Sequence, residues 1–134
     1  MPYDKIDKQD VEKVLKNLTG KAPKITITAG AANVATFTIQ FAEKGVHQFD
    51  LYMSTDSAGA NVSATTYSTG LAATTGVVAV TLTANKYLKV LTDATGKAVI
   101  TLTATAKPAG EYMCVPAAGG GLAMSAATVT GSYG

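Results

Sequence analysis

Residues 77–91 (VVAVTLTANKYLKVL) and residues 97–105 (KAVITLTAT) alternate small, β-branched and apolar side chains almost without a charge. A period of two, carried by valine, isoleucine and threonine, is typical of β-strands that bury one face. The connections at residues 84–86 and 93–96 contain residues that favour turns. These stretches therefore predict antiparallel strands, and their scarcity of reactive side chains favours a role in assembly.

Length and composition limit the class of protein. The chain has 134 residues, of which 47% are hydrophobic and 15% are charged. This length fits one domain with its own core, and no apolar run is long enough to cross a bilayer. Charges at Asp4, Lys5 and Asp7 stand where a secretory signal would need an apolar segment. We therefore expect one soluble domain that is made and used without export.

Two features of the ionisable residues restrict partners and cross-links. Cys114 is the only cysteine, so the chain can form no internal disulfide and its fold must be held by packing. Every cation is a lysine. Because arginine supplies the planar group that reads guanine and phosphate, we expect no specific nucleic-acid partner. We also expect no membrane partner, since no apolar run reaches spanning length.

Residues 8–18 predict one short amphipathic helix. Its apolar residues recur at the helical spacing i, i+3, i+4 and i+7, and Pro23 then directs the chain into an extended segment. The apolar stripe either packs on the sheet of its own chain or docks on a neighbouring subunit. We interpret residues 1–24 as a helical, anchoring segment and residues 25–134 as a β domain. The residues of the stripe are Val11, Val14, Leu15 and Leu18.

The β domain is predicted to consist of short strands and turns. Residues 33–41 and 47–55 each place large apolar side chains on one face, and the turn between them predicts a hairpin. Residues 56–76 predict a long loop, or a loop that contains a short irregular strand. Seven or eight strands without a βαβ rhythm indicate an antiparallel sandwich. The predicted core comprises Phe37, Ile39, Phe41, Phe49, Leu51, Val90, Ile100 and Leu102.

The residues offer no catalytic or metal-binding motif. His47 is the only histidine, and a carboxylate at Asp50 would point to the opposite face of the same strand. Residues 56–61 place oxygen donors around a glycine, but they lack the further acidic ligands of a calcium loop. We interpret them as a turn initiated by Asp56. One histidine and one cysteine cannot form a zinc site. We predict no enzyme activity, no cofactor and no metal.

Four strand and turn motifs follow one another through the last two thirds of the chain: LYMSTDSAG at 51–59, STG at 68–70, ANKYLKV at 84–90 and GEYMCVP at 110–116. This pattern resembles small Ig-like β-sandwich proteins from the virions of tailed bacteriophages, several of which are capsid decoration, or cement, subunits. The resemblance implies a mainly β protein, an antiparallel Ig-like β-sandwich of about seven to eight strands. It also implies a non-enzymatic structural protein that binds the major capsid protein at subunit junctions.

The resemblance implies a place and partners as well. Such a protein is made in the host cytoplasm and lies on the capsid exterior, where we expect it to form a homo-oligomer, a dimer or a trimer. In similar proteins a terminal arm often anchors the subunit to the shell, so we expect residues 1–24 to dock and residues 56–75 to provide a second contact. The candidate contact residues are Tyr3, Ile6, Val11, Val14, Leu15, Leu18, Asp56, Asn61 and Tyr67.

Two other hypotheses remain. A tail or neck component of a virion would have the same structural character. An Ig-like adhesion module would bind carbohydrate through exposed aromatic faces, for which Tyr67, Tyr112 and Tyr133 are the candidates, although the chain has no tryptophan.

Overall fold

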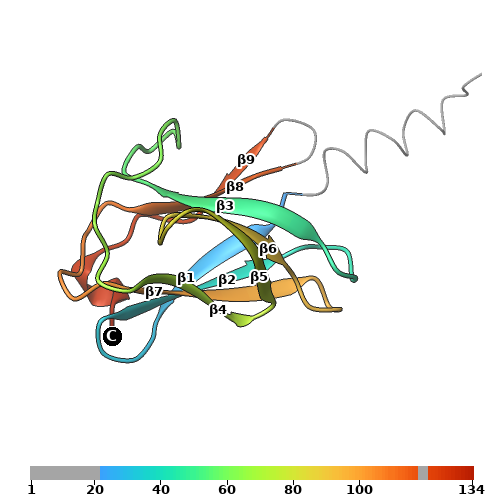
Figure 1. The fold of residues 1–134 in the computed structure, drawn as a ribbon, viewed down its shortest axis with the longest axis horizontal. Helices are drawn as coiled ribbons and strands as arrows, with labels where there is room; N and C mark the ends of the chain where they lie inside the picture. Colours follow the sequence, from blue (N-terminus) through green and yellow to red (C-terminus); the bar gives the residue numbers. More distant parts are fainter. Residues whose placement is uncertain (1–21, 118–120) are drawn as a thin grey trace, which may run out of the picture.

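The structure, a computed structural model, describes residues 22–117 and 121–134, which form two antiparallel sheets lying face to face (Figure 1). The four-stranded sheet has the order β1-β2-β7-β4, and the five-stranded sheet has the order β5-β6-β3-β8-β9. A single 3-10 turn, η1, lies near the C-terminus of the described chain. The elements are β1 (Lys24–Ala29), β2 (Val34–Gln40), β3 (Gln48–Ser54), β4 (Gly70–Thr75), β5 (Val77–Thr83), β6 (Tyr87–Leu91), β7 (Lys97–Thr103), β8 (Tyr112–Pro116), β9 (Leu122–Met124) and η1 (Thr130–Ser132).

The prediction of a mainly β, antiparallel fold is confirmed, with nine strands in the described residues where seven or eight were expected. The additional strand is β4, which lies in the small-residue region 56–76. The predicted helix at residues 8–18 lies outside the described residues. No helix in the part of the chain that the structure describes has the length and apolar character needed to span a bilayer.

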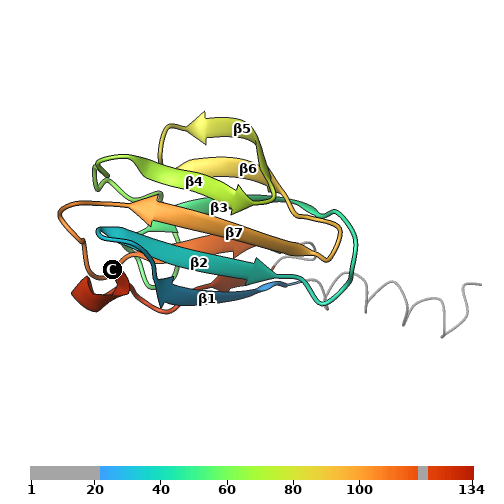
Figure 2. The same cartoon turned by 90° about the horizontal axis from the view of Figure 1, so that it is seen from below.

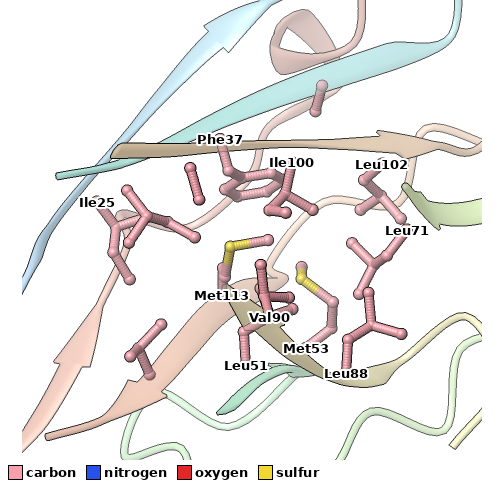
Figure 3. Packing of buried hydrophobic residues seen from close by; sticks show 14 of the residues in the cluster. Ile25, Phe37, Leu51, Met53, Leu71, Leu88, Val90, Ile100, Leu102 and Met113 are labelled. Carbon is pink, nitrogen blue, oxygen red and sulfur yellow. The ribbon is translucent and has the colours of Figure 1, made fainter. Parts of the chain in front are cut away.

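One core fills the space between the two sheets (Figure 3). Phe37 on β2 and Ile100 on β7 project from one sheet, and Leu51, Met53 and Met113 project from the other; all five are fully buried. Alternation explains this arrangement, because every second side chain of each strand points to the same face. All eight predicted core residues are buried, so the sequence prediction of the core is confirmed.

The predicted hairpin between residues 33–41 and 47–55 is wrong. β2 pairs with β1 and β7, whereas β3 pairs with β6 and β8 in the other sheet. The two strands lie in different sheets, so their apolar faces point toward each other across the core. Residues 41–47 therefore cross between the sheets. Two hydrogen bonds hold the end of this crossing, from the His47 N–H to Thr92 Oγ1 (2.8 Å) and from the Thr92 N–H to the His47 carbonyl (2.9 Å).

A second crossing, from β4 to β5, takes place at one residue, Gly76. Its φ is +87°, and a Cβ at this position would lie 2.5 Å from the carbonyl oxygen of Leu91. Only glycine adopts this conformation and tolerates this approach without strain. The chain thus passes from the edge of one sheet to the edge of the other, and β4 and β5 lie on the same side of the molecule (Figure 2).

Truncating the centre of the core should destabilise the fold strongly. Phe37→Ala is expected to lower the free energy of unfolding by about 3–5 kcal/mol, because it removes a fully buried ring and leaves a cavity. Its neighbour Thr38 is half-exposed on the outer face of β2, so Thr38→Ala should change the same quantity by less than about 0.5 kcal/mol. Urea unfolding followed by circular dichroism measures both. Equal effects of the two substitutions would contradict the assigned faces of β2.

Candidate functional site

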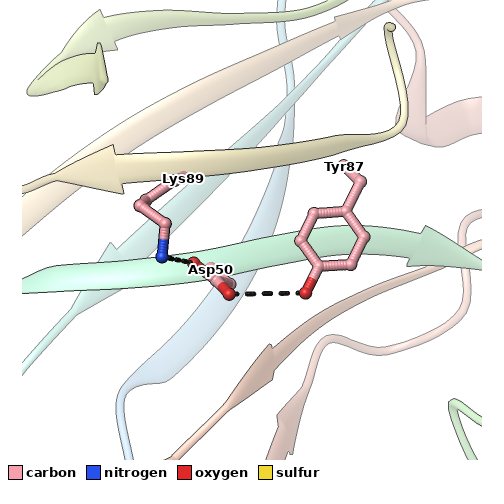
Figure 4. Close-up of polar contacts among 3 residues, drawn as sticks. All are labelled: Asp50, Tyr87 and Lys89. Atoms are coloured by element: carbon pink, nitrogen blue, oxygen red, sulfur yellow. Dashed lines mark hydrogen bonds and ion pairs between the residues drawn. The ribbon is translucent and has the colours of Figure 1, made fainter. Parts of the chain in front are cut away.

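The only histidine and its nearest sequence carboxylate take part in separate contacts. The His47 ring stacks on Phe41, with ring centroids 4.6 Å apart. Asp50, on the outer face of β3, forms an ion pair with Lys89 (2.9 Å) and accepts a hydrogen bond from the Tyr87 hydroxyl (3.3 Å) (Figure 4). His47 and Asp50 therefore do not form the oriented pair that a general base requires.

The thiol and the acidic residues also occupy structural positions. Cys114 on β8 is fully buried, and burial raises the pKa of its thiol. A buried thiol of raised pKa has little thiolate and reacts slowly. Within residues 22–117 and 121–134, no group of three or more histidine, cysteine, aspartate or glutamate side chains is arranged to hold a metal ion.

A buried carboxylate fastens the longest loop of the described chain to the strands beneath it. Glu111, directly before β8, is 1% exposed. Its Oε1 accepts hydrogen bonds from the hydroxyls of Thr65 (2.5 Å) and Ser63 (3.4 Å), and its Oε2 accepts one from the Tyr67 hydroxyl (2.9 Å). Because a buried charge without partners is costly, these three hydroxyls make the position of Glu111 possible. We call residues 55–69, which this carboxylate holds, the pinned loop.

The tyrosine of this cluster faces the interior. Tyr67 is 3% exposed, and burial raises the pKa of its hydroxyl, which keeps the group protonated as a donor to Glu111. Tyr133 is also buried and donates a hydrogen bond to the carbonyl of Pro108 (2.9 Å), whereas Tyr112 is half-buried. The side chain of Tyr67 therefore holds the pinned loop through its hydrogen bond to Glu111, and it is not part of the molecular surface.

The start of the pinned loop is fixed by a tight turn, as the sequence predicts. The Asp56 carboxylate accepts a hydrogen bond from the Ala58 N–H (2.8 Å), and the Asp56 carbonyl accepts one from the Gly59 N–H (2.9 Å). Gly59 has a φ of +69°, and a Cβ there would lie 3.1 Å from the Cys114 sulfur. The Tyr52 hydroxyl donates to the Gly59 carbonyl (2.5 Å). Gly59 therefore lies directly over Cys114.

Between its two fastened ends the pinned loop presents small and uncharged side chains. Asn61 is exposed and Val62 is 39% exposed. Of the predicted loop contacts, Asn61 is thus exposed, Asp56 is half-buried and Tyr67 is buried. The other predicted contacts, Tyr3, Ile6, Val11, Val14, Leu15 and Leu18, lie outside the described residues.

Glu111 was not among the functional residues predicted from the sequence. A signal for it exists, because Glu111 is the only charged residue after Lys107 and it precedes the apolar run at residues 112–115. An isolated charge at the start of a buried strand needs partners in the interior. The identity of those partners requires the fold, since Tyr67 lies 44 positions away.

Comparison with known proteins gives no relative: no protein-family model, curated protein or solved structure matches the chain at a significant level. A functional assignment therefore depends on the geometry of the described residues and on the pattern of strand and turn motifs.

Removing the buried carboxylate should release the pinned loop. Glu111→Ala leaves the hydroxyls of Thr65 and Tyr67 without their acceptor, and we expect it to lower the free energy of unfolding by about 1–3 kcal/mol. Limited proteolysis should then cut within residues 57–69 faster than in the parent chain. Glu111→Gln retains one acceptor oxygen, so its cleavage rate should lie between those of the parent chain and Glu111→Ala. A cleavage rate unaffected by Glu111→Ala would show that the carboxylate does not hold the loop.

Alkaline pH should destabilise the fold through Tyr67. Burial raises the pKa of this hydroxyl above its ordinary value of 10.0. Above pH 10 the unfolded chain releases a proton that the folded chain keeps, so the free energy of unfolding falls as pH rises, by up to about 1.4 kcal/mol per pH unit for one group. Below pH 10 this contribution is fully present. Tyr67→Phe should reduce the slope measured by urea unfolding at increasing alkaline pH. An identical slope in both proteins would refute the assignment.

Proposed function

We propose that this chain is a non-enzymatic structural protein of a tailed-phage virion that decorates the head and stabilises the capsid shell at subunit junctions. The observation that carries the proposal is the pinned loop, whose residues 57–69 are uncharged and whose conformation is fixed by a buried carboxylate. A contact surface that is ordered before binding loses less conformational entropy when its partner docks. Such a loop suits a permanent contact with another protein.

The positions of the reactive groups support a structural role. His47 stacks on a phenylalanine, Cys114 is buried beneath the pinned loop, and Glu111 is occupied by three hydroxyls. Each of these groups contributes to the fold of the chain. A subunit that covers a junction between capsid proteins needs a stable scaffold and complementary loops, and it needs no chemistry.

The strand order supports the Ig-like part of the proposal. With strands numbered along the chain, a variable-type immunoglobulin domain has the sheets 1-2-7-6 and 5-4-3-8-9. The sheets here are 1-2-7-4 and 5-6-3-8-9. The two arrangements differ only in the exchange of the fourth and sixth strands. We therefore propose an Ig-like β-sandwich in which the chain visits the strands of one edge in reverse order.

In this proposal the protein contacts the major capsid protein through two segments. Residues 1–24 anchor the subunit through the apolar residues predicted above, and residues 56–75, which include most of the pinned loop, provide the second contact. Oligomerisation about a local symmetry axis would engage several copies at once, and such multivalency makes weak individual contacts effectively permanent.

Locating the protein in a virion tests the proposal directly. Image reconstruction of a labelled virion should show it on the capsid exterior at junctions between capsid subunits. Density in the tail or neck would refute head decoration and favour the tail component. Capture of specific glycans on an array, without binding to capsid shells, would favour the adhesion module instead.

Deleting residues 1–22, which leaves β1 intact, should abolish binding to purified capsid shells, because these residues include every predicted contact of the proposed anchor. Co-sedimentation of the protein with the shells measures this binding. Circular dichroism should show that the shortened chain keeps its β structure. Unchanged binding would show that the anchor lies elsewhere.

A charge on the pinned loop should weaken the same binding. Val62→Asp places a carboxylate on the exposed part of the loop, and we expect about a tenfold loss of affinity, or ~1.4 kcal/mol. Val129 is 59% exposed just before η1, so Val129→Asp is a matched control that should bind like the parent chain. Equal losses from both substitutions would show a general effect of charge and would contradict a specific role for the loop.

A further inference from the structure

β5 is an outer strand whose open edge and side chains face solvent. It pairs with β6 alone. Val77, Val80 and Leu82 are 60%, 46% and 52% exposed, which is unusual for large apolar side chains. Among the residues that the structure describes, the only hydrogen bond to the β5 backbone outside the pairing with β6 is the turn from the Lys86 N–H to the Thr83 carbonyl. An outer strand of this kind can add another strand to its sheet.

The devices that usually protect an outer strand are few on β5. Natural edges carry charges, contain proline or β-bulges, or are very short. The edge strand β1 contains Lys24, and the edge strand β9 has three residues. β5 has seven residues without charge or proline, but its pairing with β6 shifts register between Val78 and Val80 and again between Thr81 and Thr83. Such irregularities disrupt the ladder locally, so the regular part of this edge is limited to Val80 and Thr81.

The charge distribution indicates what covers this edge. Residues 57–85, which include β4 and β5, contain no charged residue and form the longest uncharged run in the chain. Two identical antiparallel strands oppose each other without like-charge repulsion only when they are uncharged or carry charges in complementary positions. Two copies of β5 meet this condition, because the strand contains no charged residue. A charged strand would find no opposite charge on β5.

We propose that β5 pairs with β5 of a second copy of this chain, antiparallel about a two-fold axis, so that the two five-stranded sheets become one continuous sheet. An axis through Val80, the middle residue of β5, would place Val80 opposite its own copy. The register shifts on either side of Val80 and Thr81 limit regular pairing to the residues around the axis. Val80 opposite its own copy is a β-branched cross-strand pair, which stabilises antiparallel sheets. The interface is isologous, as a closed dimer requires.

The N-terminal segment of the same chain is the other possible occupant, and the topology disfavours it. The described chain begins beside β1, which is the edge of its sheet farthest from β4. β5 lies on the side of β4, across the molecule from β1 (Figure 2). A second copy needs no such traverse. This inference does not depend on the proposed role in a virion.

Sedimentation of the full chain tests the interface. At concentrations up to about 100 µM, where small interfaces associate, the parent chain should form a dimer. Val80→Lys brings two ammonium groups together at the axis and should weaken dimerisation at least tenfold. Val46 lies in the crossing at residues 41–47 and is 63% exposed, so Val46→Lys should dimerise like the parent chain.

Several outcomes would overturn the proposal. They are a parent chain that is monomeric at every concentration, a trimer, a Val80→Lys chain that dimerises normally, and a Val46→Lys chain that is weakened equally. Binding of a capsid-protein strand at β5 without self-association would also overturn it. Because the readout is the mass of the purified chain, failure here leaves the virion proposal intact, and absence from virions leaves the dimer intact.

A cysteine at the axis gives a second test that does not add charge to β5. Opposed residues of an antiparallel pair have Cα atoms about 4.5–5.5 Å apart, which permits a disulfide. Val80→Cys should therefore form covalent dimers on mild oxidation, detected on non-reducing gels, whereas Val46→Cys should not. The native Cys114 is buried and should remain unreactive in both chains. Equal cross-linking of the two variants would contradict the two-fold pairing.

Discussion

The contact between two alternating rows of apolar side chains, one from each sheet, is the constraint on which the rest of the molecule depends. The chain has a single cysteine, so no internal disulfide shares this task. Phe37 on β2 and Leu51 on β3 enter this core from different sheets, so the segment between them crosses from one sheet to the other. The crossings in turn leave β4 and β5 as neighbouring edges, and the long connection from β3 to β4 becomes the pinned loop. Both proposed contact surfaces of the described chain therefore follow from the way the chain crosses between the two sheets.

Local alternation was sufficient to predict most strands and the whole predicted core. It predicted the inward faces of β2 and β3 because a period of two assigns each side chain to a face regardless of which strand lies alongside. Pairing is a different matter, since it depends on contacts between residues far apart in sequence. The supposed hairpin failed for that reason. β4 was difficult to recognise because its residues, GLAATT, are small, and only Leu71 among them is a large apolar side chain.

The candidate site was less predictable than the fold. Residues 56–76 could be recognised as unusual, and Asp56 as the start of a turn. Tyr67 looked like a surface aromatic because its neighbours are serine, threonine and glycine. Its burial follows from Glu111, a residue in a different segment whose charge requires hydroxyl donors. Sequence patterns describe each residue among its neighbours along the chain, whereas the contacts of this cluster join segments that are far apart in sequence. The edge of β5 was likewise invisible, since VVAVTLT predicts a buried central strand equally well.

The position of Cys114 under Gly59 has a practical consequence for studying this molecule. The chain contains one thiol, and the turn that opens the pinned loop lies directly over it. The side chains of Leu122 and Tyr52 also lie beside Gly59, so access to the sulfur requires local opening of this region or global unfolding. The rate at which a thiol reagent modifies Cys114 under native conditions therefore reports how often this region opens. This measurement needs no engineered label, and it can be made on the same molecule whether it is free, self-associated or bound to a larger assembly.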